Sequence, residues 1–133
     1  MNTEHNCTVF NIVYNKEKRN DEYVITHLYG VHWENVKAVN AVKSGLTSAD
    51  SVNIYVPFSV KSEKSYVLPK AFAESHEGHF TFAPGDKIVK GIVDYSGNIA
   101  KIVSNFDDAV TITSVDTFDY GSNKMRHYKI SGK

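Results

Sequence analysis

The sequence predicts a mainly β protein, which is a small β-barrel or compact sandwich of about eight short strands with one short helix. Short runs rich in β-branched and aromatic residues alternate apolar with polar positions, as half-buried strands do. Turn-forming residues separate these runs, and one segment has the apolar spacing of a helix. Closure into a barrel would also hide the strand edges that otherwise promote aggregation.

The first third of the chain predicts three strands, separated by a polar, mostly charged hairpin loop at residues 15–22 and by a break at Gly30. In the first strand Phe10 and Tyr14 fall on one face at period two. The third strand carries Trp33, whose large apolar area favours a place in the core. The three predicted strands are residues 8–14, 23–29 and 31–39.

The rest of the chain predicts further short strands between loops. Pro84 and Gly85 form a turn, because proline fixes one backbone dihedral and glycine accepts a positive one. Residues 87–93 have the most apolar pattern and predict a buried strand. The predicted strands of this part are residues 51–57, 66–68, 79–82, 87–93, 110–117 and 125–131.

One helix is predicted after Asn98, which can cap its first turn, as Ser96 also can. Its apolar residues recur at the spacing of one helix face. We expect so short a helix to form only by packing against the sheet. Residues 70–78 are irregular or a single helical turn. The helical apolar residues are Ile99, Ile102, Val103 and Phe106.

The length of the chain is that of a single domain, which we expect to span residues 1–133. Lysine and arginine number 15, and so do aspartate and glutamate, so the basic excess of a duplex-binding protein is missing. Cys7 is the only cysteine and excludes an intramolecular disulfide. No run approaches the ~20 apolar residues of a membrane span, and the polar start does not resemble a secretory signal. We therefore expect synthesis in the cytoplasm and no membrane contact.

The charge is unevenly placed near the end of the chain. Residues 102–119 hold four acids and no base, and residues 120–133 hold four bases and no acid. Two interpretations stay open: the two segments pair within the domain, or they meet a neighbouring copy. The candidate contact residues are Asp107, Asp108, Asp116, Asp119, Lys124, Arg126 and Lys129.

The reactive residue types predict neither an enzyme nor a bound cofactor or metal. His76 and His79 are three residues apart, whereas the zinc-protease motif needs one more residue between its glutamate and second histidine. Cys7 is too far away in sequence to suggest a zinc site, and we expect it to be a small buried apolar group. Asp107 and Asp108 predict a solvated turn.

Two aromatic segments leave other interpretations open. His32 beside Trp33 could stack on a ligand, although we expect the tryptophan to be core. His127 and Tyr128 lie in the basic C-terminal stretch and could touch nucleic acid, but four positive charges are a weak signal for it.

Several blocks resemble an uncharacterised family of small structural proteins from prophages and siphophages of Gram-positive hosts. This family is similar to the head-closure, or stopper, proteins, and its members are often labelled minor capsid proteins. The ending is the most specific block, although the family pattern has tryptophan after His127 where this chain has Tyr128. The resembling blocks are residues 30–33, 45–50, 54–57, 66–70, 84–91, 107–116, 119–122, 125–129 and 132–133.

The resemblance implies a virion protein of the phage neck, made in the host cytoplasm. Its subunits would form a homo-oligomeric ring, a dodecamer by family analogy, below the portal and adaptor rings and above a tail terminator or tail completion protein. The ring would retain packaged genomic DNA, with which it is in transient proximity, and would dock the tail. The candidate channel or docking loops are residues 42–50 and 58–64, with Ser44, Gly45, Thr47, Ser48, Asp50, Lys61, Glu63 and Lys64.

Other roles stay open beside head closure. An adaptor, tail terminator or tail completion protein would belong to the same structural class. A monomeric β-barrel ligand-binding module is the rival class, and it would show a concave pocket lined by titratable groups with shifted pKa values.

Overall fold

A computed structural model describes residues 3–36, 51–122 and 125–133 of the chain. Within these residues the protein is mainly β, which confirms the predicted fold class. The strands are β1 (His5–Asn15), β2 (Asn20–Val36), β3 (Ser51–Pro57), β4 (Lys61–Ser62), β5 (Ser65–Tyr66), β6 (His79–Phe80), β7 (Lys87–Lys90), β8 (Ala109–Phe118) and β9 (His127–Gly132). The helices are α1 (Pro69–Glu74), the 3₁₀ helix η2 (Ile99–Lys101) and α2 (Ile102–Asn105).

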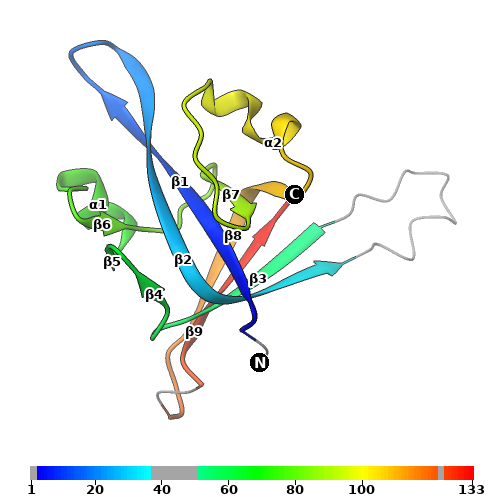
Figure 1. Cartoon of the computed structure of the whole chain (residues 1–133). Helices are drawn as coiled ribbons and strands as arrows, with labels where there is room; N and C mark the ends of the chain where they lie inside the picture. The colour runs from blue at the N-terminus through cyan, green and yellow to red at the C-terminus, as the bar shows by residue number, and fades with distance from the viewer. Residues whose placement is uncertain (1–2, 37–50, 123–124) are drawn as a thin grey trace, which may run out of the picture.

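Six strands form a closed, antiparallel barrel (Figure 1). Their order is β1-β7-β8-β9-β3-β2, and β2 pairs back with β1. The short β4 adds to β2 beside this ring, and β5 and β6 form a small parallel pair. Closure gives most strands a hydrogen-bonded partner on both sides. It thereby hides strand edges, as we expected from the sequence.

β2 runs without interruption through Gly30, so the predicted break is wrong. Gly30 instead has a φ of +94°, a conformation that glycine adopts without a steric penalty. β2 pairs with β1 up to Val31 and with β3 from His32 onward. The glycine therefore marks the place where one long strand changes partners, and the chain bends there instead of ending.

The barrel encloses the main core. Alternate residues of each strand point inward, and Ile54, Ile130 and Val31 have no exposed surface. Trp33 is only 4% exposed and belongs to this cluster, which confirms its predicted core position. Cys7 is also fully buried there, as expected for a small apolar group.

A second apolar cluster lies outside the barrel, where residues 91–108 fold back over β1. Phe10 and Val89 face outward from their strands and pack with Ile102 of α2. The side chain of Asn98 accepts a hydrogen bond from the backbone N–H of Ala100, so the predicted cap is confirmed. The strand predicted at residues 87–93 ends earlier, at Lys90, because Gly91 turns the chain with a φ of +90°.

Candidate interaction surface

The acidic and basic segments of the C-terminal part meet each other across β8 and β9. Asp116 is the register partner of Lys129, and a carboxylate oxygen of Asp119 lies 3.5 Å from Nε of Arg126. Half-exposed pairs of this kind contribute about 0–1 kcal/mol to stability. The geometry supports the intradomain interpretation for Asp119 and Arg126, whereas Asp116 and Lys129 are aligned in register.

The remaining charged candidates lie elsewhere. Asp107 and Asp108 occupy an exposed turn between α2 and β8, at the opposite end of β8 from Asp119. The structure therefore does not bring the acidic residues together as one strip. Lys124 lies outside the described residues.

The predicted docking loop at residues 58–64 lies against the barrel. Lys61 and Ser62 form β4 and pair with β2. A carboxylate oxygen of Glu63 accepts a hydrogen bond from the backbone N–H of His27 at 3.0 Å, and Nζ of Lys64 donates to the carbonyl of Ile25 at 2.6 Å. Burial raises the pKa of Glu63, but the hydrogen bonds from backbone N–H groups, His27 among them, lower it further than that, so its pKa lies below the ordinary value.

These two side chains continue the strand addition that β4 begins, because they satisfy the next backbone groups along β2. Glu63 and Lys64 are thus held against the barrel wall, and Lys61 remains exposed. The other predicted loop residues, Ser44, Gly45, Thr47, Ser48 and Asp50, lie outside the described residues.

A continuous row of aromatic rings crosses the outer wall of the barrel, which we call the aromatic row. Adjacent ring centroids along it lie 4.8 to 6.1 Å apart, and the closest pair, Phe118 and His127, is stacked at an interplanar angle of 16°. His32, Tyr55 and His127 are each next in sequence to a residue that packs in the core. The row consists of His5, His32, Tyr55, His127, Phe118 and Tyr120, from β1, β2, β3, β9, β8 and the turn after β8.

The aromatic row is partly exposed: five of its rings are half-buried and only Tyr120 is largely exposed. Tyr120 is 65% exposed at one end, and Met125 beside it is 57% exposed. Arg126 of the Asp119 ion pair lies next to His127 in sequence. Aromatic residues, methionine and arginine are the types enriched at protein interfaces, and charged residues are depleted from interface centres. The surface thus has the composition of a protein contact.

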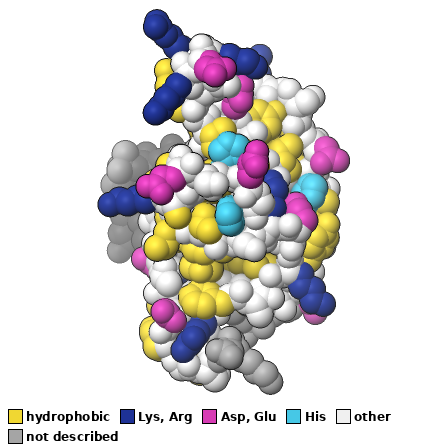
Figure 2. All heavy atoms as spheres, turned by 90° about the vertical axis from the view of Figure 1, so that its left-hand side faces the viewer, with side chains coloured by type: hydrophobic (Ala, Val, Ile, Leu, Met, Phe, Trp, Pro, Cys, Tyr) yellow, Lys and Arg dark blue, Asp and Glu magenta, His cyan; other side chains and the backbone are white. Residues whose placement is uncertain are grey.

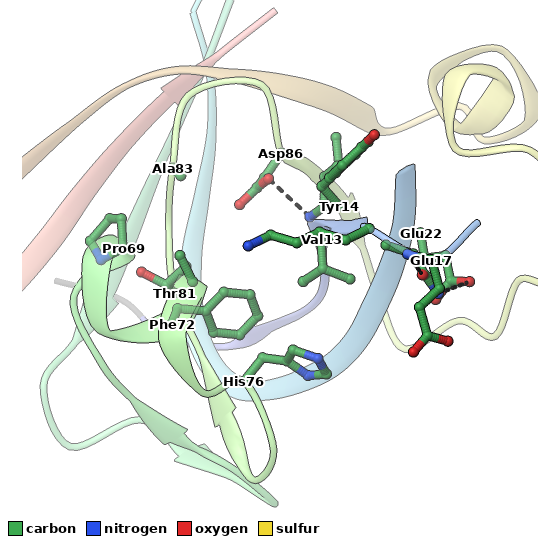
Figure 3. A pocket seen from close by; sticks show the side chains of 14 residues that line it. Val13, Tyr14, Glu17, Glu22, Pro69, Phe72, His76, Thr81, Ala83 and Asp86 are labelled. Atoms are coloured by element: carbon green, nitrogen blue, oxygen red, sulfur yellow. Dashed lines mark hydrogen bonds between the residues drawn. The ribbon is translucent and has the colours of Figure 1, made fainter. Parts of the chain in front are cut away.

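A groove of about 730 Å³ lies on another side of the barrel, between the β1–β2 hairpin and α1 (Figure 3). Val13 of β1 and Phe72 of α1 contribute apolar walls, and Asp86 lies at the inner end. Figure 2 faces this side and shows charged side chains of both signs at the top, around the hairpin tip. The groove is partly open to solvent, whereas small-molecule sites bury most of their ligand.

A buried hydrogen-bond network fixes the inner end of the groove. Nδ2 of Asn11 donates to the carbonyl of Thr81 at 2.7 Å and to the carboxylate of Asp86 at 2.8 Å. The backbone N–H of Thr81 donates back to Oδ1 of Asn11, and the N–H of Ile12 donates to Asp86. Burial raises the pKa of Asp86 above its ordinary value, although these hydrogen bonds oppose the shift.

Both carboxylate oxygens of Asp86 are therefore occupied within the protein. The carboxylate of Asp86 therefore has a structural role, which is to position the loop after β6. It has no free oxygen that could act as a base toward a substrate in the groove.

The described residues contain no group of three or more histidine, cysteine or acidic side chains arranged to hold a metal ion. His76 is exposed and His79 is half-buried in β6, so the pair forms no shared site. Burial raises the pKa of the Cys7 thiol to about 12, which makes a thiolate nucleophile unfavourable at this position. In the part of the chain that the structure covers, no helix has the length and apolar character needed to cross a membrane.

A family model described as a family of unknown function, DUF6751, matches residues 2–133. The chain belongs to DUF6751. No curated protein and no solved structure matches it. We therefore interpret the two surfaces of this DUF6751 chain, the aromatic row and the groove, from the chemistry of the residues that form them.

Sequence reasoning missed the aromatic row of this DUF6751 chain as a unit. It singled out His32 and His127 separately, as candidates for ligand stacking and nucleic-acid contact, and did not connect them with Tyr55 or Phe118. The available signal was that His32, Tyr55 and His127 occupy outward positions beside inward apolar residues. The register that aligns β2, β3, β9 and β8 is a tertiary property, and only the structure supplies it.

Proposed function

We propose that this DUF6751 chain is a structural subunit of the head-tail connector of a tailed bacteriophage, which forms a head-closure ring below the portal and adaptor and helps to retain packaged DNA. The observation that carries the proposal is the aromatic row. It is a long, partly exposed surface on a closed barrel, and it includes residue types that protein interfaces favour. The resemblance of the sequence blocks to small phage structural proteins supplies the setting.

A ring requires a heterologous interface, in which one face of the subunit binds a different face of the next. The barrel offers two chemically different surfaces, the aromatic row and the groove between the β1–β2 hairpin and α1. Other neck or tail roles, such as adaptor, tail terminator or tail completion protein, use the same kind of surfaces. They are therefore less specific forms of the same proposal.

The rival function is a monomeric β-barrel that binds a small ligand in the groove. The raised pKa of Asp86 favours it, because shifted titratable groups are common in ligand sites. The hydrogen bonds that occupy both oxygens of this carboxylate explain the position of Asp86 without a ligand. The assembly role is therefore the better supported of the two.

The first test is made in virions of a phage that encodes this chain, with the gene deleted and supplied in trans. We expect the chain in purified particles, and we expect the double variant Tyr120→Lys with Met125→Lys to fold normally yet be incorporated at least tenfold less. Two charges placed on an interface that excludes water are costly to bury. Quantitative mass spectrometry of the particles measures incorporation.

The matched control is Ile92→Lys, which changes an exposed apolar residue (41% exposed) away from the aromatic row and from the groove. It should be incorporated like the natural chain. Absence of the chain from purified virions would refute the proposed function, and equal incorporation of all three forms would remove the aromatic row as its contact surface.

A charge exchange separates the two interpretations of the acidic and basic segments. The double variant Asp119→Arg with Arg126→Asp restores the internal ion pair with reversed polarity, so stability should stay within about 1 kcal/mol of the natural chain. If these charges also face a neighbouring subunit, incorporation falls despite the restored pair. We expect that fall, with Lys101→Glu, an exposed change on η2, as the unaffected control.

Unchanged incorporation of the exchanged variant would instead assign Asp119 and Arg126 to intradomain pairing alone. Urea unfolding of the natural chain, both single variants and the double variant gives a double-mutant cycle. The cycle measures the interaction free energy of the Asp119–Arg126 pair.

A further inference from the structure

The start of β1 is held to β2 by side chains at the place where the ladder of the two strands is irregular. The register shifts between His5 and Asn6, close to the point where β2 changes partners. Oδ1 of Asn6 accepts a hydrogen bond from the backbone N–H of Gly30 at 3.2 Å, and Nδ1 of His5 accepts one from the backbone N–H of Trp33 at 3.1 Å. Side chains of β1 thus supply acceptors to two backbone N–H groups of β2.

The hydrogen bond at His5 depends on the protonation state of the ring. An imidazole nitrogen accepts from an N–H only while it carries no proton, so the bonded ring is neutral and has its proton on Nε2. An imidazolium has N–H groups on both nitrogens and accepts no hydrogen bond. The N–H of Trp33 points toward β1, away from its register partner in β3, so β3 cannot replace the lost acceptor. Protonation of His5 therefore breaks this bond.

A second histidine lies beside the first. The ring centroids of His5 and His32 are 6.0 Å apart, so charges on both rings would repel each other. Nδ1 of His32 is buried and has no hydrogen-bond partner among the described residues, so a proton there would be left without an acceptor. Nε2 of His32 lies 3.9 Å from a carboxylate oxygen of Glu34, and this long, half-exposed pair stabilises a charged ring only weakly. This corner of the barrel therefore suits two neutral rings.

Three other titratable groups lie near the start of β1. Glu4 precedes His5 in the chain and is exposed. Tyr55 of β3 lies beside His32, with 5.6 Å between the ring centroids. Lys61 of β4 lines the same hollow as Thr3, two residues before His5. Within the described residues, the ring of His5 forms its hydrogen bond with Trp33 and no ion pair with any of these groups, so the bond to Trp33 is what its protonation changes.

Loss of this bond frees only the first residues of the strand. The C=O of Asn6 accepts a hydrogen bond from the N–H of Gly91 at 2.7 Å, and the side chain of Asn6 stays bound to Gly30. From Cys7 onward β1 pairs with both β2 and β7. Release therefore stops at Asn6, and the barrel stays closed.

We propose that His5 is an acid-released latch, whose neutral ring holds residues 3–5 on β2 and whose protonation frees them. Histidine is the side chain that ordinarily changes charge between about pH 5 and pH 8, so we expect the latch to be closed at about pH 8 and released at about pH 5. His5 is also the β1 member of the aromatic row, so release shortens that row by one ring. The latch is a property of the single chain and goes beyond the proposed function.

An NMR titration of the ¹⁵N-labelled full chain between about pH 8 and about pH 5 tests the latch. Ring ¹⁵N signals identify which nitrogens of His5 carry a proton, and we expect Nε2 alone to carry one at the alkaline end. The backbone amide signals of Trp33 and of residues 3–5 should then move in the same transition as the ring of His5. The ratio of released to held chains should rise as the pH falls, by at most about tenfold per pH unit, which is the slope for one linked proton.

Four variants make the result specific. His5→Asn places an amide oxygen where Nδ1 was, and this acceptor cannot be charged, so residues 3–5 should stay held at every pH. His5→Ala removes the acceptor, so these residues should be released at every pH. His32→Asn keeps the latch and should keep the transition of the Trp33 amide. His76→Asn changes an exposed histidine elsewhere on the surface and should behave like the natural chain.

A Trp33 amide that moves with pH in His5→Asn as it does in the natural chain would overturn this inference. A proton on Nδ1 of His5 at the alkaline end would also overturn it, as would loss of the transition in His32→Asn. All of these measurements are made on the isolated chain. A chain that is absent from virions can therefore still show the latch, and a chain that is present in virions can lack it.

Discussion

Replacing Asn11 with alanine is expected to destabilise the fold by about 4 kcal/mol. The substitution removes a fully buried side chain that satisfies the N–H and C=O of Thr81 and one oxygen of Asp86. Each buried polar group left without a partner costs about 1–3 kcal/mol. Because small domains have only about 5–15 kcal/mol of stability, the variant should be close to unfolding. Urea unfolding followed by Trp33 fluorescence measures the change.

Asn53→Ala is the matched control. Asn53 is half-buried on the outer wall and accepts a single hydrogen bond, from the Ser131 hydroxyl, so its loss should cost less than about 1 kcal/mol. If the two variants had equal stability, the Asn11 network would contribute nothing beyond an ordinary surface hydrogen bond.

Replacing Tyr128 with alanine should cost about 4 kcal/mol, the usual range for removing a packed aromatic ring. The ring lies 4.6 Å from that of Phe58, 4.4 Å from that of Tyr66 and 5.7 Å from that of Phe82, measured between centroids. It thus joins β9 to the chain segments around β4, β5 and β6. Thermal and urea unfolding measure the loss, with Tyr14→Ala, at an exposed ring, as the nearly neutral control.

The conservative changes at Tyr128 sharpen this prediction. Tyr128→Trp introduces the residue that the resembling family carries there, and it should retain most of the stability because the aromatic contacts persist. If Tyr128→Trp were as unstable as Tyr128→Ala, the space around residue 128 would be too small for the larger indole ring.

Tyr128→Phe isolates the hydroxyl. Burial, with Tyr66 and Asp119 adding to it, raises the pKa of Tyr128 from 10.0 to about 12. The folded state therefore favours the neutral phenol, and this contribution is present below pH 10 and is lost as the pH rises towards 12. The phenylalanine variant should lose less stability between pH 8 and 11 than the natural chain does.

Local rules account for the parts of the fold that were correctly predicted. The alternation of Val52, Ile54 and Val56 defines a strand with the observed bounds, residues 51–57. Asn98 caps the helix that follows it because its side-chain oxygen reaches the N–H two residues on. Both features depend on residues within a few positions of one another.

The parts that were missed depend on contacts between distant residues. Gly30 has the local signature of a break, but pairing with β1 on one side of it and β3 on the other keeps the strand continuous. The inner end of the groove joins Asn11 to Asp86, and the aromatic row joins five strands and the turn after β8. No spacing rule connects these positions, because their proximity follows from the closure of the barrel.

The continuity of β2 has a mechanical consequence for any assembly built from this chain. At a rise of about 3.3 Å per residue, its 17 residues trace a path of about 55 Å. That path begins at the tip of the β1–β2 hairpin and ends at Val36, the register partner of Ser51 in β3. A displacement of the hairpin tip would therefore be carried to the far end of β2 along a single hydrogen-bonded strand, and Gly30, with its positive φ, is the position in it with the greatest backbone freedom.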